Sequence, residues 1–292
     1  MNRHAQCPVT GRVATFYCEK QGIGYYRETR SGIIFEAEPP DSQTMVAYAD
    51  AEYSKGLYAD YAKAGDLKLA TSERRLESIK EYARGTRLLD VGCSCGFFLE
   101  AAARQGFDVT GVEFSQVAVS LAVPAIRERI ICGDLASIRT RGNASYDVVS
   151  AFDVIEHTRD PVQFVRELWQ VLSPGGLLVL TTPDTGHWLR RVMGKHWPML
   201  QPLQHTVLFS RSALRNLLEA VGFQDLVVGD ARKVLTADYL FGQLRNHRLI
   251  WALYSGLGWM VPERLRRMPL SVNIGEFIVY ARKPVGTGSE SK

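Results

Sequence analysis

Apolar runs and amphipathic segments alternate through the middle of the chain. Runs rich in Val, Ile and Leu are separated by stretches in which apolar residues recur at helical spacing. The strand-like runs are 86–91, 107–114, 128–134, 146–157 and 175–182, and the helices expected between them are about 96–105, 115–123 and 161–172. Nearly continuous apolar strands that alternate with helices are typical of a parallel sheet covered on both faces. The pattern predicts a doubly wound α/β domain, with its ligand crevice at the carboxyl ends of the strands.

The flanking segments have different patterns. Residues 1–45 contain short apolar runs broken by Gly and Pro, which predicts a small β-rich unit. We expect the main domain to span 46–284, with a first helix near 66–83 and a helical segment at about 231–270. Residues 285–292 are expected to form a disordered tail.

The composition limits the kinds of partner. With 292 residues, 46% of them hydrophobic, the chain can bury one large core. Its 35 basic and 31 acidic residues are mixed without a long basic block, so charge gives no reason to expect a nucleic-acid partner. The five scattered cysteines and an N-terminus without an apolar signal core favour a cytoplasmic location. No run of about 18 apolar residues occurs, so we expect no membrane-spanning helix.

The turn after the first strand reads DVGCSCG, residues 90–96. Three interpretations compete: a metal site, a redox pair, or a backbone cradle for a small ligand. Cys93 and Cys95 are separated by one residue, whereas redox and zinc pairs usually have two, and no second pair follows. We therefore interpret them as loop residues. The glycines lie where a strand leads into a helix, which favours the backbone cradle.

Acidic residues end successive predicted strands. Glu113 comes 23 positions after Asp90, where a carboxylate can accept both hydroxyls of a ribose. Asp134 is followed by Leu135, an arrangement suited to the amino group and ring face of adenine, and Asp153 follows Phe152 after the fourth strand. Any one of these acids alone is more simply a loop or helix cap. Four acids at neighbouring strand ends predict a nucleoside pocket.

Phe97 and Phe98 follow the last glycine of the turn and argue against a pyrophosphate seat, as NAD would need. The turn instead resembles the first motif, DxGxGxG, of the class I S-adenosylmethionine-dependent methyltransferases, with Ser94 at the middle glycine. LSPGGLLVLTTPD at 172–184, HTVLFSRSALRNLLEAVGF at 205–223 and FIVYARK at 277–283 are similar to later segments of that family. The resemblance covers about 67–283. It implies a seven-stranded, mostly parallel Rossmann-like sheet whose last strand is antiparallel.

The resemblance also implies a cofactor and its contacts. S-adenosylmethionine would donate a methyl group, with the ribose on Glu113, the adenine on Asp134 and Leu135, and the methionine end shaped by Asp90 and the glycines. The expected cofactor-binding set is Asp90, Gly92, Cys93, Ser94, Gly96, Glu113, Phe114, Asp134, Leu135, Phe152 and Asp153.

Two histidines are candidates for the catalytic base. His157 follows Glu156 after the fourth strand, where an imidazole could take a proton from a hydroxyl; the alternative is that both residues only begin the next helix. His205 is the second candidate. Asp153, Glu156 and His157 also resemble the ExxEH motif of the ubiquinone-biosynthesis O-methyltransferases, which is associated with a divalent ion. Because Asp replaces the first Glu, a Mg²⁺ site is a secondary hypothesis, and we assign no metal ligand.

The N-terminal unit resembles a zinc ribbon that has lost its ligands. CPVTG at 7–11 and YRETRSGIIF at 26–35 are similar to the ribbon found ahead of some bacterial methyltransferase domains. The four metal positions would be Cys7, Thr10, Glu28 and Ser31, and three lack a thiolate. A closed zinc site cannot be built from them, so we predict a unit without zinc that keeps the hairpin shape.

The acceptor is the least constrained part of the prediction. Aromatic residues expected near the pocket (Phe152, Trp188, Trp197 and Phe209) favour a small or amphiphilic molecule, with a hydroxyl of a sugar, glycolipid or related metabolite as the leading interpretation. The alternatives are C- or N-methylation of a nucleotide sugar and a non-catalytic scaffold; the absence of a basic aromatic patch disfavours RNA. The apolar stretch 249–261 with its flanking arginines is either a lid or, through 245–267, a peripheral contact with the inner face of the membrane that would suit a lipid-linked acceptor.

Overall fold

A seven-stranded sheet forms the centre of the molecule in the computed structural model, which describes residues 3–54, 65–139, 145–239 and 262–285. In sheet order the strands are β11 (Gln224–Asp230), β14 (Glu276–Arg282), β9 (Leu172–Pro183), β8 (Tyr146–Phe152), β5 (Arg87–Val91), β6 (Asp108–Glu113) and β7 (Ile130–Cys132). The five strands from β9 to β7 are parallel, and β14 lies antiparallel between β9 and β11. The predicted Rossmann-like sheet is confirmed.

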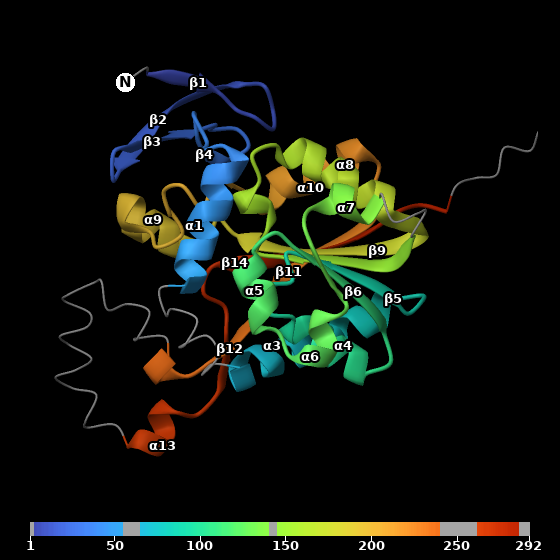
Figure 1. Ribbon diagram of the computed structural model, residues 1–292. Coiled ribbons are helices and arrows are strands. Elements are labelled where there is room, and N and C mark those ends of the chain that lie inside the picture. The colour runs from blue at the N-terminus through green and yellow to red at the C-terminus, as the bar shows by residue number, and fades with distance from the viewer. Residues whose placement is uncertain (1–2, 55–64, 140–144, 240–261, 286–292) are drawn as a thin grey trace, which may run out of the picture.

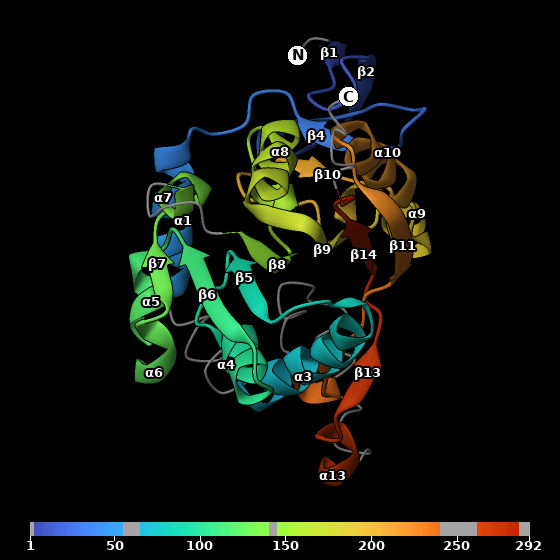
Figure 2. The ribbon, with the colours of Figure 1, turned by 90° about the vertical axis from the view of Figure 1, so that its right-hand side faces the viewer.

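Helices cover both faces of this sheet. On one face lie α3 (Gly65–Tyr82) and α4 (Phe97–Arg104), and on the other lie α8 (Pro161–Val171) and α10 (Arg211–Val221), as Figure 2 shows. Side chains alternate between the faces along each strand: Leu88 belongs to the core under α3 and α4, whereas Leu89 belongs to the core under α8 and α10. Burial on both faces explains why the strand sequences read as continuous apolar runs.

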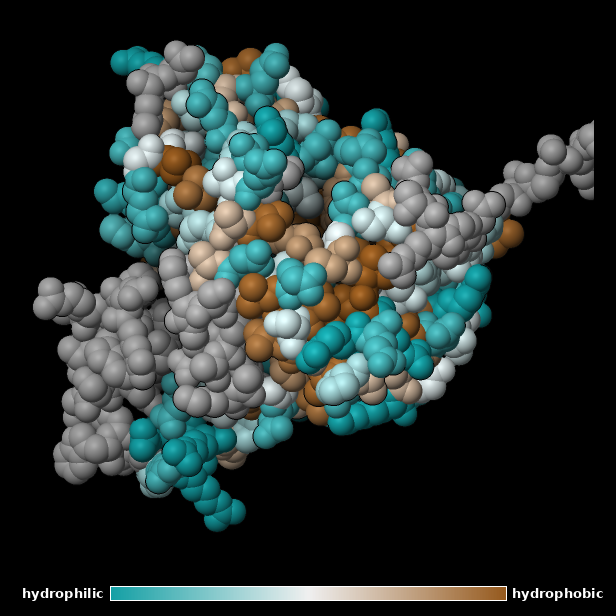
Figure 3. Space-filling view, in the orientation of Figure 1, coloured by the Kyte–Doolittle hydropathy of each residue, from teal (hydrophilic) through white to brown (hydrophobic). Residues whose placement is uncertain are grey.

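Short helices complete the α/β domain near β6 and β7. They are α5 (Gln116–Leu121), α6 (Pro124–Arg127) and α7 (Leu135–Arg139). The helix predicted at 115–123 is confirmed as α5, and Pro124 begins a separate short helix after it, α6, which was not predicted. Figure 3 shows hydrophobic residues gathered near the centre of this face, around α5, where Phe114, Leu121 and Val123 are exposed.

The N-terminal residues form a second, smaller sheet, at the top of Figure 1. Its strands are β1 (His4–Gln6), β2 (Val13–Lys20), β3 (Ile23–Arg27) and β4 (Ile34–Glu36). A fifth strand, β10 (Val207–Leu208), comes from the far side of the sequence and pairs antiparallel with β4. The small sheet is thus tied to the segment between β9 and α10, a connection that the sequence did not predict.

The remaining elements border the carboxyl ends of the central strands. Helix α1 (Ser42–Ser54) packs on α5, and β12 (Lys233–Leu235) pairs with β13 (Leu270–Val272) next to α3. The others are the 3-10 turns η1 (Ile155–His157) and η2 (Gly194–His196) and the helices α9 (Trp188–Met193) and α13 (Glu263–Arg266).

The helical segment predicted at 231–270 is partly wrong, because β12 and the start of β13 lie at its two ends. The whole apolar stretch 249–261 and the tail from 286 lie outside the described residues, so the choice between a lid and a membrane contact stays open. Among the described residues, no helix is long and apolar enough to cross a membrane.

Candidate active site

A cavity of about 490 Å³ opens at the carboxyl ends of β5, β6 and β8, with further walls from α1, α3 and β12. The crevice therefore lies where the strand order predicts it. Nine of the predicted site residues line it: Asp90, Gly92, Cys93, Ser94, Glu113, Phe114, Phe152, Asp153 and His157. Five do not: Gly96, Asp134, Leu135, Glu156 and His205.

The turn after β5 brings bare backbone to the cavity. Gly92 and Gly96 have φ of 69° and 77°, and a Cβ added to them would lie 2.6 Å from Val154 Cγ2 and 2.5 Å from Ile126 Cγ2. Only glycine fits both the backbone conformation and the space. Ser94 keeps the left-handed conformation, with φ of 51°, although it is not glycine. Its backbone N–H donates to Glu113 Oε2 at 2.9 Å, which links the turn to the next strand.

Glu113 lies at the end of β6 with its carboxylate held on both sides. Its Oε1 accepts the N–H of Ser115 at 2.9 Å, while its Oε2 accepts that of Ser94. Burial raises the pKa of this carboxyl, although these backbone hydrogen bonds oppose the shift. Because each carboxylate oxygen has a second lone pair, Glu113 can still accept from ligand hydroxyls.

Asp90 lies next to Glu113 at the end of β5 and is 3% exposed. Ser150 donates to its Oδ1 at 2.7 Å. Burial raises the pKa of Asp90 to about 7. The carboxyl therefore changes its charge near neutral pH, at the point where the turn faces the cavity.

The structure places the predicted adenine contacts outside the cavity lining. Asp134 is exposed and its Oδ1 accepts both the N–H and the hydroxyl of Ser137 at 3.1 Å, so it caps the start of α7. Leu135 is 3% exposed and packs in the core. Gly96 does not line the cavity either, and it is the residue that precedes α4. A role of Asp134 and Leu135 in adenine binding stays a prediction.

Sequence reasoning missed the basic residues of the cavity. Arg75 in α3 places its guanidinium 4.3 Å from the centre of the Phe152 ring, and its buried Nε and Nη2 have no hydrogen-bond partner among the described residues. Lys68, two turns earlier on the same face of α3, also lines the cavity, and its pKa is lowered to about 8 by burial and by Lys233. In the sequence both are ordinary charged positions of an amphipathic helix, and only the packing of α3 beside β8 shows where they point.

These features fit S-adenosylmethionine. The turn offers backbone without side chains, Glu113 can bind the ribose hydroxyls, and the guanidinium of Arg75, whose Nε and Nη2 make no hydrogen bond to the described residues, can hold the methionine carboxylate. The cavity crosses the sheet from β6 to β8. The donor would therefore place its ribose toward Glu113 and its methionine end toward Arg75.

The two histidines lie against each other near the β8 end. Their ring centres are 4.8 Å apart. The Nδ1 of His157 lies 2.9 Å from the Gln204 carbonyl and that of His205 lies 2.7 Å from the Met199 carbonyl. A carbonyl only accepts, so each Nδ1 carries the proton and each Nε2 keeps a lone pair. Burial lowers the pKa of His157, and burial together with His157 lowers the pKa of His205 to about 3.

Glu156 is buried beneath these histidines and does not face the cavity. Its side chain accepts the hydroxyl of Thr182 at 2.9 Å, and burial with the nearby Asp153 raises its pKa well above the ordinary value. Ligand atoms of Glu156, His157 and His205 lie within 4.8 Å of one another.

The residues of the DxxEH motif do not fit a Mg²⁺ site. Mg²⁺ prefers six oxygen ligands, whereas this cluster offers one carboxylate and two imidazoles. Asp153 is turned to other partners: Thr181 donates to its Oδ1 at 2.8 Å, and Lys233 Nζ lies 2.9 Å from its Oδ2. Burial opposes ionisation, but Lys233 and Arg75 outweigh it and hold the pKa of Asp153 well below its usual range.

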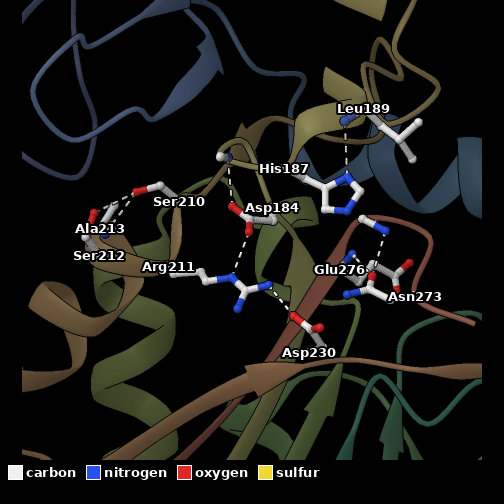
Figure 4. Close-up of polar contacts among 12 residues, drawn as sticks. Asp184, His187, Leu189, Ser210, Arg211, Ser212, Ala213, Asp230, Asn273 and Glu276 are labelled. Atoms are coloured by element: carbon white, nitrogen blue, oxygen red, sulfur yellow. Dashed lines mark hydrogen bonds and ion pairs between the residues drawn. The ribbon is translucent and has the colours of Figure 1, made fainter. Parts of the chain in front are cut away.

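A polar network fixes the turn from which β14 begins (Figure 4). Asn273 Oδ1 accepts the N–H groups of Gly275 and Glu276 at 2.8 and 3.1 Å. Beside it, Arg211 donates to Asp184 at 2.8 Å and to Asp230 at 2.6 Å, which joins the ends of β9 and β11. The network sets the place of Glu276, whose Oε1 lies 2.6 Å from Lys233 Nζ.

Comparison with known proteins identifies the family of the chain. The profile of a methyltransferase domain family matches residues 59–228. The ubiquinone biosynthesis O-methyltransferase of Caulobacter sp. (strain K31) is 35% identical over 103 residues, 34% of this chain and 41% of that protein. That of Idiomarina loihiensis is 28% identical over 155 residues, 49% of this chain and 64% of that protein. The chain thus spans about half the length of the curated relatives it matches.

Solved structures show the same fold. An S-adenosylmethionine-dependent methyltransferase from Thermotoga maritima has a TM-score of 0.52 at 16% identity and covers 81% of this chain and 99% of its own. One from Archaeoglobus fulgidus has a TM-score of 0.51 at 16% identity and covers 76% of this chain and 99% of its own. The family match over residues 59–228 covers more than half of the chain. The chain belongs to the methyltransferase domain family, within the class I S-adenosylmethionine-dependent methyltransferases.

Proposed function

We propose that the protein transfers a methyl group from S-adenosylmethionine to an oxygen of a small or amphiphilic acceptor, with a hydroxyl of a sugar, glycolipid or related metabolite as the leading candidate. One observation carries the proposal: a single cavity joins the glycine turn and Glu113 at one end to His157 at the other. The relatives named O-methyltransferases support oxygen as the methylated atom.

The chain's task at the donor end is orientation. Bound donor supplies a methyl group on a positively charged sulfur, which is already a good leaving group. Glu113 would hold the ribose of the donor, and Arg75 would hold its carboxylate. The backbone of the turn would contact the part of the donor between them. A donor fixed at three points cannot rotate its methyl group away from the acceptor, and such positioning is a large part of the catalytic effect.

At the other end, His157 is the residue best placed to receive a proton. It lines the cavity, whereas His205 is 6% exposed and lies behind it. The bond from Nδ1 to the Gln204 carbonyl leaves the Nε2 lone pair as the proton acceptor. His157 would take the proton of the acceptor hydroxyl as the oxygen attacks the methyl group. His205 packs on the imidazole and keeps its orientation.

The shape of the cavity supports a small acceptor. Phe97, Phe98, Phe114, Phe152 and Leu235 give it apolar walls. Of the four aromatic residues expected there, Phe152 alone is part of the wall: Trp188 is 63% exposed, and Trp197 and Phe209 are buried in the core.

Two experiments test the proposal. Calorimetry with S-adenosylmethionine and with NADH examines the cofactor, and we expect only the first to bind. In Glu113→Gln one carboxylate oxygen becomes an NH2 group, which cannot accept the N–H of Ser94 or Ser115, so we expect donor affinity to fall about 10- to 100-fold. Glu100→Gln, in α4 and outside the cavity lining, should leave it unchanged. If NADH binds and S-adenosylmethionine does not, the proposed methyl transfer from S-adenosylmethionine is wrong.

The acceptor is found by incubating the protein with labelled methyl donor and fractionated bacterial extract. Label in sugar or lipid pools supports the proposal, and label in the lipid pool supports the peripheral membrane contact expected for 245–267. Label in nucleotide sugars with C- or N-linked methyl groups supports the first alternative. Donor binding without any labelled product in these pools supports the scaffold.

A further inference from the structure

A buried lysine stands beside the first acid of the DxxEH motif. The ammonium of Lys233, in β12, lies 2.9 Å from Asp153 Oδ2 and 2.6 Å from Glu276 Oε1. Its side chain is 19% exposed and faces the cavity. The three residues come from β12, the end of β8 and the start of β14, so the cluster exists only in the folded chain.

The scaffold fixes the two carboxylates on which this lysine rests. Asp153 has a φ of 58°, a conformation uncommon for a residue with a side chain, and its N–H and carboxylate are both bonded to Thr181. Glu276 is held by the Asn273 turn of Figure 4. Strained backbone persists only where its surroundings specify it, and it gathers at functional sites. The position of the ammonium is therefore set in advance.

The ammonium has capacity left for a ligand. It carries three N–H groups, and two face the carboxylates of Asp153 and Glu276. No described residue accepts from the third. The pair of carboxylates keeps the lysine charged, although burial opposes the charge, and the pKa of Lys233 is raised. Lys233 is thus a donor and a fixed cation, and it cannot serve as the base.

A fixed cation beside a reacting oxygen does part of the work of a metal ion. It stabilises negative charge on an oxygen that is losing its proton, and it orients that oxygen by a hydrogen bond. A divalent ion beside Asp153 would have to share this place with the ammonium of Lys233 and with Arg75, whose Nη2 lies 4.0 Å from Asp153 Oδ2.

We propose that the Lys233 ammonium takes the place of a divalent metal ion at the acceptor end of the cavity, where it binds the acceptor oxygen through its remaining N–H while His157 takes the proton. The proposal rests on the proposed function for its second half. The first half, that the ammonium fills a cation site formed by Asp153 and Glu276, is independent of it.

The first test uses metal ions alone and needs no acceptor. We expect calorimetry to show no binding of Mg²⁺ or Mn²⁺ to the wild-type protein at these residues. Lys233→Met should gain one Mn²⁺ site, because two buried carboxylates then lack a cation, and adding Asp153→Asn should remove it. Lys283→Met, which changes a lysine bonded to the Trp169 and Leu172 carbonyls, is the control and should gain no site.

Two results would overturn the first half of the proposal. Mn²⁺ bound by the wild-type protein and lost in Asp153→Asn would show that a metal ion already fills the site. A folded Lys233→Met protein that gains no Mn²⁺ would show that Asp153 and Glu276 do not form a site for a metal cation. If Lys233→Met does not fold, Lys233→Gln replaces it, because its neutral amide can donate to the carboxylates of Asp153 and Glu276 without supplying a charge, and the same Mn²⁺ results are expected.

The second test uses the extract fraction that the wild-type protein labels. We expect chelation by EDTA to leave the wild-type rate unchanged. We expect Lys233→Met to lower the rate about 100-fold or more, with donor affinity within about threefold, while Lys233→Arg recovers part of the rate. A rate that EDTA abolishes and Mg²⁺ restores, or a rate unchanged in Lys233→Met, would overturn the second half. Absence of label with wild-type protein would reject the proposed function and leave the metal-binding result standing.

Discussion

Three carboxyl groups at neighbouring strand ends differ in charge because their partners differ. Asp153 faces Lys233 and Arg75 and stays ionised. Asp90 has a hydroxyl as its main partner and titrates near pH 7, while Glu113 is held by backbone N–H groups. In the sequence the three look alike, since each simply ends an apolar run. Their chemistry is decided by long-range neighbours.

The charge of Asp90 makes stability depend on pH. Its pKa is about 7 in the folded protein, against 3.8 as the ordinary value, so the folded state keeps a proton that the unfolded chain has already lost. The free energy of unfolding should therefore fall as the pH rises from about 4 to about 7, and about 2 to 3 kcal/mol of the fall should lie between pH 5 and pH 8.

Urea unfolding of the donor-free protein at pH 5 and pH 8 measures this. Asp90→Asn keeps the acceptor for Ser150 but has no proton to lose, so its unfolding free energy relative to wild type should rise by that amount between the two pH values. Asp108→Asn, whose side chain is 76% exposed, should show no such change. Equal differences for Asp90→Asn at both pH values would contradict the prediction.

His157 is expected to limit the rate of label transfer. His157→Gln should lower the rate about 10²- to 10⁴-fold and leave donor affinity nearly unchanged, because the residue touches the acceptor and not the donor. His196→Gln, in η2 away from the cavity, is the matched control. Since burial lowers the pKa of His157, the wild-type rate should fall only below the ordinary pH range of histidine. A wild-type rate in His157→Gln would remove this residue as the base.

At the scale of elements, the sequence predicts what depends on neighbours in the chain. The central strands could be predicted because both of their faces are buried, which makes their sequences continuously apolar. The turn after β5 could be predicted because its φ values require glycine. Lys233 and β10 were missed for the opposite reason. Lys233 gains its role from Asp153 and Glu276, and β10 is only two residues long and pairs with β4 across most of the sequence.

The turn between β3 and β4 of the N-terminal sheet is organised by a carboxylate. Glu28, at one of the four expected metal positions, is 2% exposed and accepts the N–H groups of Arg30 and Ser31 at 2.8 Å each. A carboxylate thus satisfies the turn that a metal-bound cysteine would otherwise organise. The backbone N–H of Gly32 donates to the Glu28 carbonyl at 2.8 Å and closes the same turn.

Removing this carboxylate should destabilise the protein. Glu28→Ala leaves two backbone donors without their acceptor, so we expect the free energy of unfolding to fall by about 2 kcal/mol. Glu19→Ala, at an exposed position of β2, should have little effect. Thermal unfolding with and without EDTA gives the second readout: a midpoint lowered by the chelator would show that a metal ion, rather than Glu28, holds the turn.

At the scale of the whole molecule, the cavity collects residues from α1, α3, the central sheet and β12, elements that lie far apart in the sequence. A ligand that bridges them should therefore stabilise the entire fold. At a donor concentration about 100 times its dissociation constant, linkage gives about 2.7 kcal/mol of added stability, provided that the unfolded chain does not bind.

Thermal unfolding with S-adenosylmethionine should show this as a midpoint raised by several degrees, and NADH at the same concentration should leave the midpoint unchanged. Arg75→Met keeps the apolar stem of the side chain but removes the guanidinium, so the shift at the same donor concentration should shrink. Arg104→Met, on the exposed side of α4, should keep the full shift. A full shift in Arg75→Met would mean that the methionine carboxylate lies away from α3, and the direction assigned to the donor in the cavity would have to be reversed.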